Sequence, residues 1–139
     1  PVMPGPVKDC AAARLVQSEA LAALDRLFEA EGWRARIVRS AFEATGPEAL
    51  IVVEAEAETL KRATVAIEES HPLGRLFDID VIDPDAGAIS RGGLGLPTRR
   101  CFVCGEAAHA CARSRADPLD RLLAVLETTI DAYRTRPSA

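Results

Sequence analysis

Residues 76–82 read LFDIDVI, an apolar run interrupted by Asp78 and Asp80. Aromatic and β-branched residues in this alternating pattern predict a β-strand. Aspartate is disfavoured in strands, and a buried carboxylate is costly unless something neutralises its charge. The predicted strand closes a series of alternating helices and strands, so this stretch decides how the preceding elements combine into a fold.

The residues before this stretch carry two helical patterns and two strand patterns. Apolar residues at helical spacing predict helices over residues 10–31 and 59–70, with Asp9 as the N-cap of the first. β-rich runs predict strands over residues 33–41 and 49–55. Together with the final strand, the order is α-β-β-α-β.

One strand before Cys10 completes the β-α-β-β-α-β order of the ferredoxin-like fold. Only Val2 and Met3 are available for that strand, and the chain begins at Pro1 rather than at a methionine. We therefore expect an α+β fold with a ferredoxin-like core whose first strand is mostly missing. Residues 1–139 are expected to form one domain that lacks an N-terminal segment.

The C-terminal part is predicted to be less regular. Residues 83–87 predict a turn, with 88–90 returning as a hairpin arm. A glycine-rich connection at 92–97 leads to a cysteine-rich loop. Residues 118–133 have the apolar spacing of an amphipathic helix.

The composition excludes several classes of function. The 139 residues are 48% hydrophobic and only 4% aromatic, with a net charge of −4. Scarce aromatics and an acidic balance argue against a nucleic-acid partner. No apolar run approaches the roughly 18 residues of a membrane span, and no secretory segment is evident. We therefore expect a cytoplasmic protein without a membrane partner.

The two aspartates have two readings. On a strand, positions 78 and 80 share a face, and adjacent carboxylates repel unless a cation separates them. Mg²⁺ held by such a pair and by substrate phosphates suits phosphoryl-group chemistry, whereas two solvated aspartates on a wet face are equally compatible with the spacing. His71 is a candidate general base or a helix-terminal residue. Arg75 is a candidate phosphate ligand or a partner of a surface acid.

Lys8 precedes a predicted helix N-terminus, where free N–H groups favour an anion, although a solvated loop lysine fits equally well. The cysteine-rich loop offers a possible zinc set, namely Cys101, Cys104, His109 and Cys111. The spacing is tight for one metal, so reduced structural cysteines or a redox role remain open. Four arginines flank the cluster and suit a polyphosphate, an acidic partner or an ordinary charged surface: Arg99, Arg100, Arg113 and Arg115.

Several stretches together resemble one enzyme family, the citrate lyase holo-acyl-carrier-protein synthases, also called apo-citrate lyase phosphoribosyl-dephospho-CoA transferases. The matching stretches follow one another in order along the chain: GPVKD at 5–9, GPEAL at 46–50, SHPLGRLFDIDV at 70–81, ISR at 89–91, LPTRRCFVC at 96–104 and CARSR at 111–115. Members of the family usually carry a further stretch upstream of GPVKD.

The resemblance implies transfer of a phosphoribosyl-dephospho-CoA group from 2′-(5″-triphosphoribosyl)-3′-dephospho-CoA to a serine of the citrate lyase acyl-carrier (gamma) subunit, with release of pyrophosphate. It implies Mg²⁺ at Asp78 and Asp80, with His71 as the candidate base. Phosphate or carrier contacts are implied for five basic residues: Lys8, Arg75, Arg91, Arg99 and Arg100. The alternatives are transfer to the malonate decarboxylase carrier, or a truncated, non-catalytic module that binds the carrier or zinc.

Overall fold

The computed structural model describes residues 1–115 and 117–136, and in them α-helices combine with two small antiparallel sheets. The helices are α1 (Ala11–Glu31), α2 (Ala57–Ser70), α3 (Ala108–Ser114) and α4 (Leu119–Arg134). The first sheet pairs β1 (Ala35–Glu43) with β2 (Gly46–Val53), and the second pairs β3 (Ile82–Asp83) with β4 (Gly87–Ala88). The α+β class expected from the sequence is confirmed.

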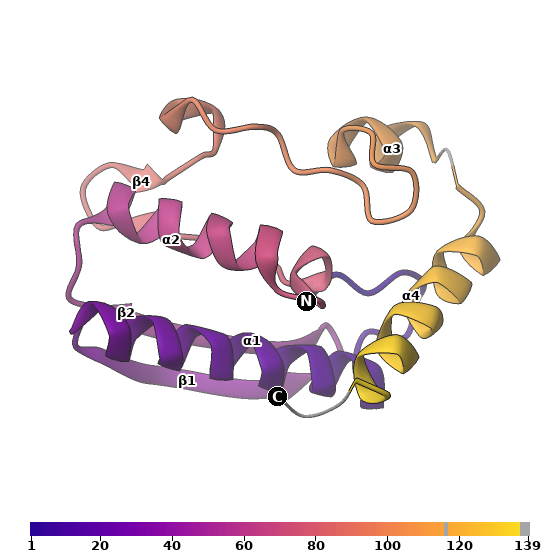
Figure 1. The fold of residues 1–139 in the computed structure, drawn as a ribbon, viewed down its shortest axis with the longest axis horizontal. Helices are drawn as coiled ribbons and strands as arrows, with labels where there is room; N and C mark the ends of the chain where they lie inside the picture. Colours follow the sequence, from indigo (N-terminus) through magenta and orange to yellow (C-terminus); the bar gives the residue numbers. More distant parts are fainter. Residues whose placement is uncertain (116, 137–139) are drawn as a thin grey trace.

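Helix α1 lies along the β1–β2 ribbon and contributes much of the core (Figure 1). Its helical spacing buries Ala13, Val16 and Phe28, and Gly32 ends it in the left-handed conformation with φ 68°. Asp9 is not its N-cap, which is a correction: Cys10 holds that position, with no side-chain cap. The Asp9 carboxylate instead accepts two hydrogen bonds from the Arg14 guanidinium, at 2.8 and 2.7 Å.

Strands β1 and β2 form a hairpin in which Glu43 lies opposite Gly46. Gly46 has φ 109°, and a Cβ atom there would lie 3.2 Å from the Lys8 carbonyl oxygen, so the position favours glycine. A register shift between Ile37 and Arg39 gives β1 one extra residue, which is a β-bulge. At the turn, β1 extends two residues and β2 three residues beyond the predicted strands, because Gly46 and Pro47 continue the ladder.

Helix α2 begins at a cap supplied by the Glu56 carboxylate, which accepts hydrogen bonds from the Glu58 and Thr59 N–H groups at 3.0 and 2.6 Å. It ends before His71, as the following proline predicts. Gly74 begins the short 3-10 helix η1 (Gly74–Leu76). An added Cβ there would lie 2.4 Å from the Glu68 carbonyl oxygen, so η1 packs backbone to backbone against the end of α2.

The segment 76–82, expected to be a strand, is the main correction to the sequence prediction. Leu76 belongs to η1, and residues 77–81 belong to no strand. Their side chains are alternately more and less buried, as in an extended segment. Among the described residues, they form no ladder beyond the bond from the Ile89 N–H, next to β4, to the Val81 carbonyl, and the β1–β2 and β3–β4 sheets have two strands each.

The C-terminal region packs back onto the N-terminal core through α4, which runs across one end of α1 in Figure 1. Leu126 and Ile130 of α4 join the core cluster. The turn at 83–87 is as predicted, with the Asp83 carboxylate accepting from the Asp85 and Ala86 N–H groups. Helix α3 was not predicted, because it is short and its cysteine was interpreted as part of the cysteine-rich loop. In the described part of the chain, no helix is both long and apolar enough to cross a membrane.

Candidate active site

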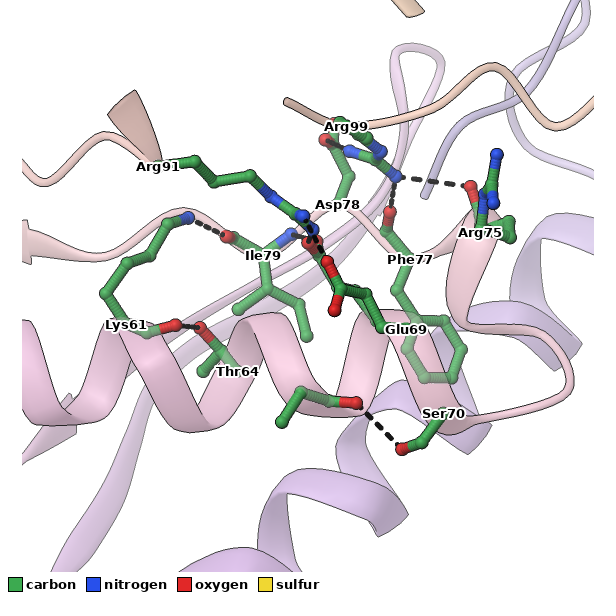
Figure 2. Close-up of polar contacts among 12 residues, drawn as sticks. Lys61, Thr64, Glu69, Ser70, Arg75, Phe77, Asp78, Ile79, Arg91 and Arg99 are labelled. Carbon is green, nitrogen blue, oxygen red and sulfur yellow. Dashed lines mark hydrogen bonds and ion pairs between the residues drawn. The ribbon is translucent and has the colours of Figure 1, made fainter. Parts of the chain in front are cut away.

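The extended residues 77–81 are held on one side by charged side chains of α2. The buried Lys61 ammonium donates to the Ile79 carbonyl at 3.0 Å (Figure 2). The buried Glu68 carboxylate accepts from the Ile79 N–H at 3.1 Å. Arg91 binds the other oxygen of Glu68 at 2.5 Å and Glu69 at 2.8 Å. These bonds replace the ladder that a neighbouring strand would supply.

Two arginines connect η1 with the cysteine-rich loop in opposite directions. Arg99 reaches back to the Asp78 carboxylate at 2.8 Å and to the carbonyl oxygens of Arg75, at 3.2 Å, and Phe77 (Figure 2). Arg75 reaches forward to the Cys101 carbonyl at 2.6 Å. Its Nε is buried and has no hydrogen-bond partner among the described residues, so this guanidinium retains one free donor.

These two arginines line a cavity of about 620 Å³, which we call the arginine cavity. Arg100 and Arg115 also line it. Its other walls are mainly apolar and come from the N-terminal residues, the cysteine-rich loop, α3 and α4: Val2, Met3, Pro4, Phe102, Ala108, Ala112, Leu119 and Leu122. A cavity with apolar walls and guanidinium groups suits a ligand that has both an apolar part and phosphates.

Asp78 and Asp80 both have exposed side chains, as expected for alternate positions of an extended segment. Asp78 is already paired with Arg99, whereas no ion pair is formed by Asp80 within the described residues. A pair of carboxylates supplemented by substrate phosphate oxygens fits the ligand preference of Mg²⁺. The geometry is therefore compatible with the predicted metal role, which stays a prediction.

His71 packs against Phe77 and lies near side chains of α1 and α4. Its ring centroid is 4.8 Å from that of Phe77 and 5.8 Å from that of Tyr133, and its Nδ1 accepts from the Leu73 N–H. Burial lowers the pKa of His71, partly opposed by the negative charge of Glu19. No hydrogen bond joins His71 to Asp78 or Asp80 in the described chain, and its role as a base stays a prediction.

Not all of the basic residues predicted to contact phosphate or the carrier lie at the arginine cavity. Lys8 donates to the Met3 carbonyl at 2.5 Å, next to the hairpin turn, and does not line the arginine cavity. Arg91 is held by Glu68 and Glu69, so its guanidinium belongs to the polar cluster beneath residues 77–81. Arg100 lines the cavity and donates to the Gly105 carbonyl at 3.4 Å. The structure thus brings together Arg75, Arg99 and Arg100, but not all five basic residues.

Three cysteines converge at the rim of this cavity. The sulfur atoms of Cys101, Cys104 and Cys111 all lie within 4.8 Å of one another, and those of Cys104 and Cys111 are 3.3 Å apart. Burial opposes the charge of Cys101, but N–H and thiol donors outweigh it and lower the pKa of that thiol. The neighbouring Cys104 thiol and burial raise the pKa of Cys111 to about 12. His109 is exposed on α3 and is not part of this group.

The buried charged residues of α2 were not predicted from the sequence. Lys61, Thr64 and Glu68 lie three and four positions apart and therefore share one face of the helix. Together with Val65 they form the buried face of α2. The sequence pattern that could have revealed them is the placement of Lys61 and Glu68 on the face of the helix that otherwise faces the core. Charged residues in such positions predict a buried polar contact with a neighbouring backbone.

Comparison with known proteins identifies the family of this chain. Residues 1–133 match the family described as apo-citrate lyase phosphoribosyl-dephospho-CoA transferase. A protein of that name from Escherichia coli O9:H4 (strain HS) is 40% identical over 130 residues, which cover 94% of this chain and 71% of the relative. A protein from Vibrio cholerae serotype O1 (strain M66-2), named a probable apo-citrate lyase phosphoribosyl-dephospho-CoA transferase, is 46% identical over 132 residues, or 94% and 74% of the two chains.

The protein is therefore an enzyme of the transferase class. The chain belongs to the apo-citrate lyase phosphoribosyl-dephospho-CoA transferase family, as the match over residues 1–133 and the identities of 40% and 46% show.

Proposed function

We propose that this chain transfers the phosphoribosyl-dephospho-CoA group of 2′-(5″-triphosphoribosyl)-3′-dephospho-CoA to a serine of the citrate lyase acyl-carrier subunit. The serine oxygen forms a bond to the phosphorus nearest the ribose, and the bond from that phosphorus to the departing pyrophosphate breaks. The serine proton passes to a base, and the product is a phosphodiester. The names of the relatives support both the group transferred and citrate lyase as its destination.

The observation that carries this proposal is the pair of arginines at an otherwise apolar cavity. Arg75 and Arg99 come from segments 24 positions apart and meet there, and Arg75 keeps a buried free donor. Guanidinium groups bind phosphate oxygens with directional hydrogen bonds. The apolar walls suit the less polar remainder of a dephospho-CoA. Positioning and charge neutralisation are the main contributions a protein makes to this kind of transfer.

Asp78 and Asp80 are the proposed ligands of Mg²⁺. When bound, the ion neutralises phosphate charge and assists the departure of pyrophosphate. Arg99 holds the Asp78 carboxylate in place from the cavity side. His71 remains the candidate base, and its lowered pKa keeps the imidazole neutral and able to accept a proton at neutral pH.

The three converging cysteines are a proposed zinc site. Thiolates are preferred zinc ligands, and a structural site takes four ligands, so Cys101, Cys104 and Cys111 leave one position for a further ligand. Three reduced thiols in one cluster also suit a cytoplasmic location. Metal analysis of protein purified without added zinc tests this assignment. About one zinc per chain supports it, and a ratio near zero removes it.

Intact-mass spectrometry of the carrier tests the transfer directly. The apo-acyl-carrier subunit of citrate lyase is incubated with the triphosphoribosyl donor, Mg²⁺ and this chain, and the expected result is a mass gain of one phosphoribosyl-dephospho-CoA group. The apo carrier of malonate decarboxylase, run in parallel, distinguishes the two acceptors. An unchanged carrier mass, when the E. coli relative modifies the same sample, contradicts the proposal.

A further inference from the structure

A groove separates β2 from the segment that follows η1. It encloses about 710 Å³. One wall is formed by residues 47–53 and the opposite wall by residues 77–84, and we call the space between them the strand groove. Apolar side chains of α1 and α2 line it as well, among them Leu21, Leu24, Phe28 and Leu60.

The β2 wall of this groove presents unpaired backbone groups. The Glu54 N–H donates to the Arg34 carbonyl at 2.8 Å, so the backbone at position 54 faces the β1 side. Backbone groups alternate in direction along a strand, and the β-bulge lies on β1, so β2 keeps this alternation. Ala49, Ile51 and Val53 therefore point their N–H and C=O groups into the strand groove. Outside the hairpin, none of these groups has a backbone partner in the described chain.

The opposite wall shows the same alternation. Carbonyl groups at alternate positions accept hydrogen bonds from outside the groove: Phe77 from Arg99, Ile79 from Lys61 and Val81 from Ile89. Asp78 and Asp80 lie between these positions, so their backbone N–H and C=O groups face the groove. No backbone partner for them exists among the described residues. Two strand-like edges thus face one another across the groove, each with unmet hydrogen-bonding capacity.

One rung of a ladder on this wall is already present. The Val2 N–H donates to the Leu76 carbonyl at 2.9 Å. Pro1 lines the strand groove with Asp78, whereas Val2 lines the arginine cavity with Arg75. The two segments therefore run antiparallel, and the ladder points from Val2 through Pro1 into the groove.

The register of this ladder is compatible with the proline. In antiparallel pairing with Val2 opposite Leu76, Pro1 lies opposite Phe77, at a position without ladder hydrogen bonds. The nitrogen of Pro1 then points away from residues 77–81, and the Phe77 carbonyl is bound by Arg99, so the ladder with this segment requires no N–H from Pro1. The next residue upstream lies opposite Asp78, and the third lies opposite Asp80.

We propose that the strand groove binds one extended β-strand, formed by the residues that directly precede Pro1 in a longer form of this chain. This strand pairs with Asp78 and Asp80 on one side and with β2 on the other. The sheet then has four antiparallel strands in the spatial order 77–81, new strand, β2, β1. Helices α1 and α2, whose apolar side chains line the groove, cover one face of this sheet. The relatives are longer chains, of which this one covers 71% and 74%.

The register also specifies the strand's side chains. Residues directly opposite each other in an antiparallel pair point to the same face. The first and third residues upstream of Pro1 therefore stand beside the Asp78 and Asp80 carboxylates, on the exposed face. The second and fourth point toward the apolar side chains of α1 and α2 and are expected to be apolar. The new strand would thus supply the neighbours of the candidate magnesium ligands.

Hydrogen exchange tests this proposal without any activity measurement. The probe is the stretch of about eight residues, a typical strand length, that precedes the position of Pro1 in the E. coli relative, fused to Pro1 of this chain. The amides of Ile51, Val53 and Asp80 are expected to exchange about a hundredfold more slowly in the extended chain. The amides of Leu50 and Val52, which face β1, are expected to change little.

A matched extension carries proline at its first and third upstream positions, which removes the N–H donors to the Asp78 and Asp80 rungs. It is expected to lose the protection at Asp80. Unchanged exchange in the extended chain, with β1–β2 amides still protected, overturns the proposal. A dimer of the present chain that protects Ile51 and Val53 also overturns it, because a second copy then fills the groove. If the fusion does not fold, the same stretch added as a peptide must give the same protection.

Discussion

Two arginine–carboxylate pairs hold the segment around residues 77–81, and they differ in exposure. The Arg91 and Glu68 side chains are 13% and 6% exposed and are joined at 2.5 Å. The Arg99 and Asp78 side chains are 25% and 53% exposed and are joined at 2.8 Å. The first pair binds the Ile79 N–H through Glu68, and the second contains Arg99, which lines the arginine cavity. Arg91, Asp78 and Arg99 are labelled in Figure 2.

This difference separates a pair that holds the fold from a pair that can meet a ligand. Breaking a buried pair leaves an uncompensated charge away from water, which is costly, whereas an exposed pair contributes little to stability. A guanidinium at a cavity surface, in contrast, remains available to phosphate oxygens. Stability measurements are therefore expected to respond to Glu68, and activity measurements to Arg99.

The largest expected effect follows from Glu68→Ala. The substitution leaves the Arg91 charge and the Ile79 N–H without their buried partner, so the free energy of unfolding is expected to fall by about 3–5 kcal/mol. Urea unfolding measures this change. Glu69→Ala is the matched control, because Glu69 binds the same arginine with a half-exposed side chain; its expected cost is within about 1 kcal/mol. Equal losses for the two variants would show that the burial of Glu68 adds nothing to its contribution to stability.

Arg99→Ala is expected to act mainly on catalysis. Removing a group that positions and neutralises phosphates lowers kcat/KM by about a hundredfold, comparable to loss of one transition-state donor. Initial rates of carrier modification provide the measurement, and Arg36→Ala on the exposed face of β1 is the control. If Arg99→Ala retains full activity, the arginine cavity is not the site of transfer.

Gly74→Ala tests how tightly the segment is seated on α2. Its Cβ would lie 2.4 Å from the Glu68 carbonyl oxygen, so the backbone of η1 must shift, at an expected cost of about 1–3 kcal/mol. Thermal unfolding reports the loss. Gly92→Ala, where nothing lies within 4 Å of the added atom, is expected to leave the melting temperature nearly unchanged. Similar behaviour of the two variants would show that η1 adjusts freely.

The smallest expected effect is a pH dependence from His71. Burial lowers the pKa of His71 below its ordinary value of 6.5. The unfolded chain therefore binds the proton more readily, and stability is fully present above about pH 6.5 and is lost as the pH falls toward the folded pKa. His71→Gln is expected to remove this slope in unfolding experiments between pH 7 and 5, whereas His109→Gln on exposed α3 keeps it. A slope that survives in His71→Gln assigns it to another group.

The helices and the hairpin were predictable because each depends on local patterns. The spacing of Val16, Ala20 and Phe28 defines α1, and the proline after His71 ends α2. The convergence of Cys101, Cys104 and Cys111 also followed from short sequence separation. In each case the interacting residues are close in the chain.

The segment 76–81 was wrongly predicted as a paired strand, although Ile82 does lie in β3, because pairing depends on a neighbour that local sequence does not specify. Its pattern gave the alternation of buried and exposed side chains but not their partners. A phosphate or carrier contact of Arg91 stays a prediction, whereas its ion pair with Glu68, 23 positions away, is visible only in the fold. Arg99 and Asp78 are 21 positions apart, and only the fold shows that they are in contact.

Calorimetric titration with 2′-(5″-triphosphoribosyl)-3′-dephospho-CoA tests whether the arginine cavity binds the donor, since it measures binding without the carrier. The wild-type chain is expected to bind this donor, and Arg75→Ala and Arg99→Ala are each expected to weaken the affinity by at least about tenfold, the expected loss of a charge-assisted contact. Arg36→Ala is expected to bind like the wild type. Equal affinity in all four proteins would contradict the assignment of the arginine cavity as the substrate site.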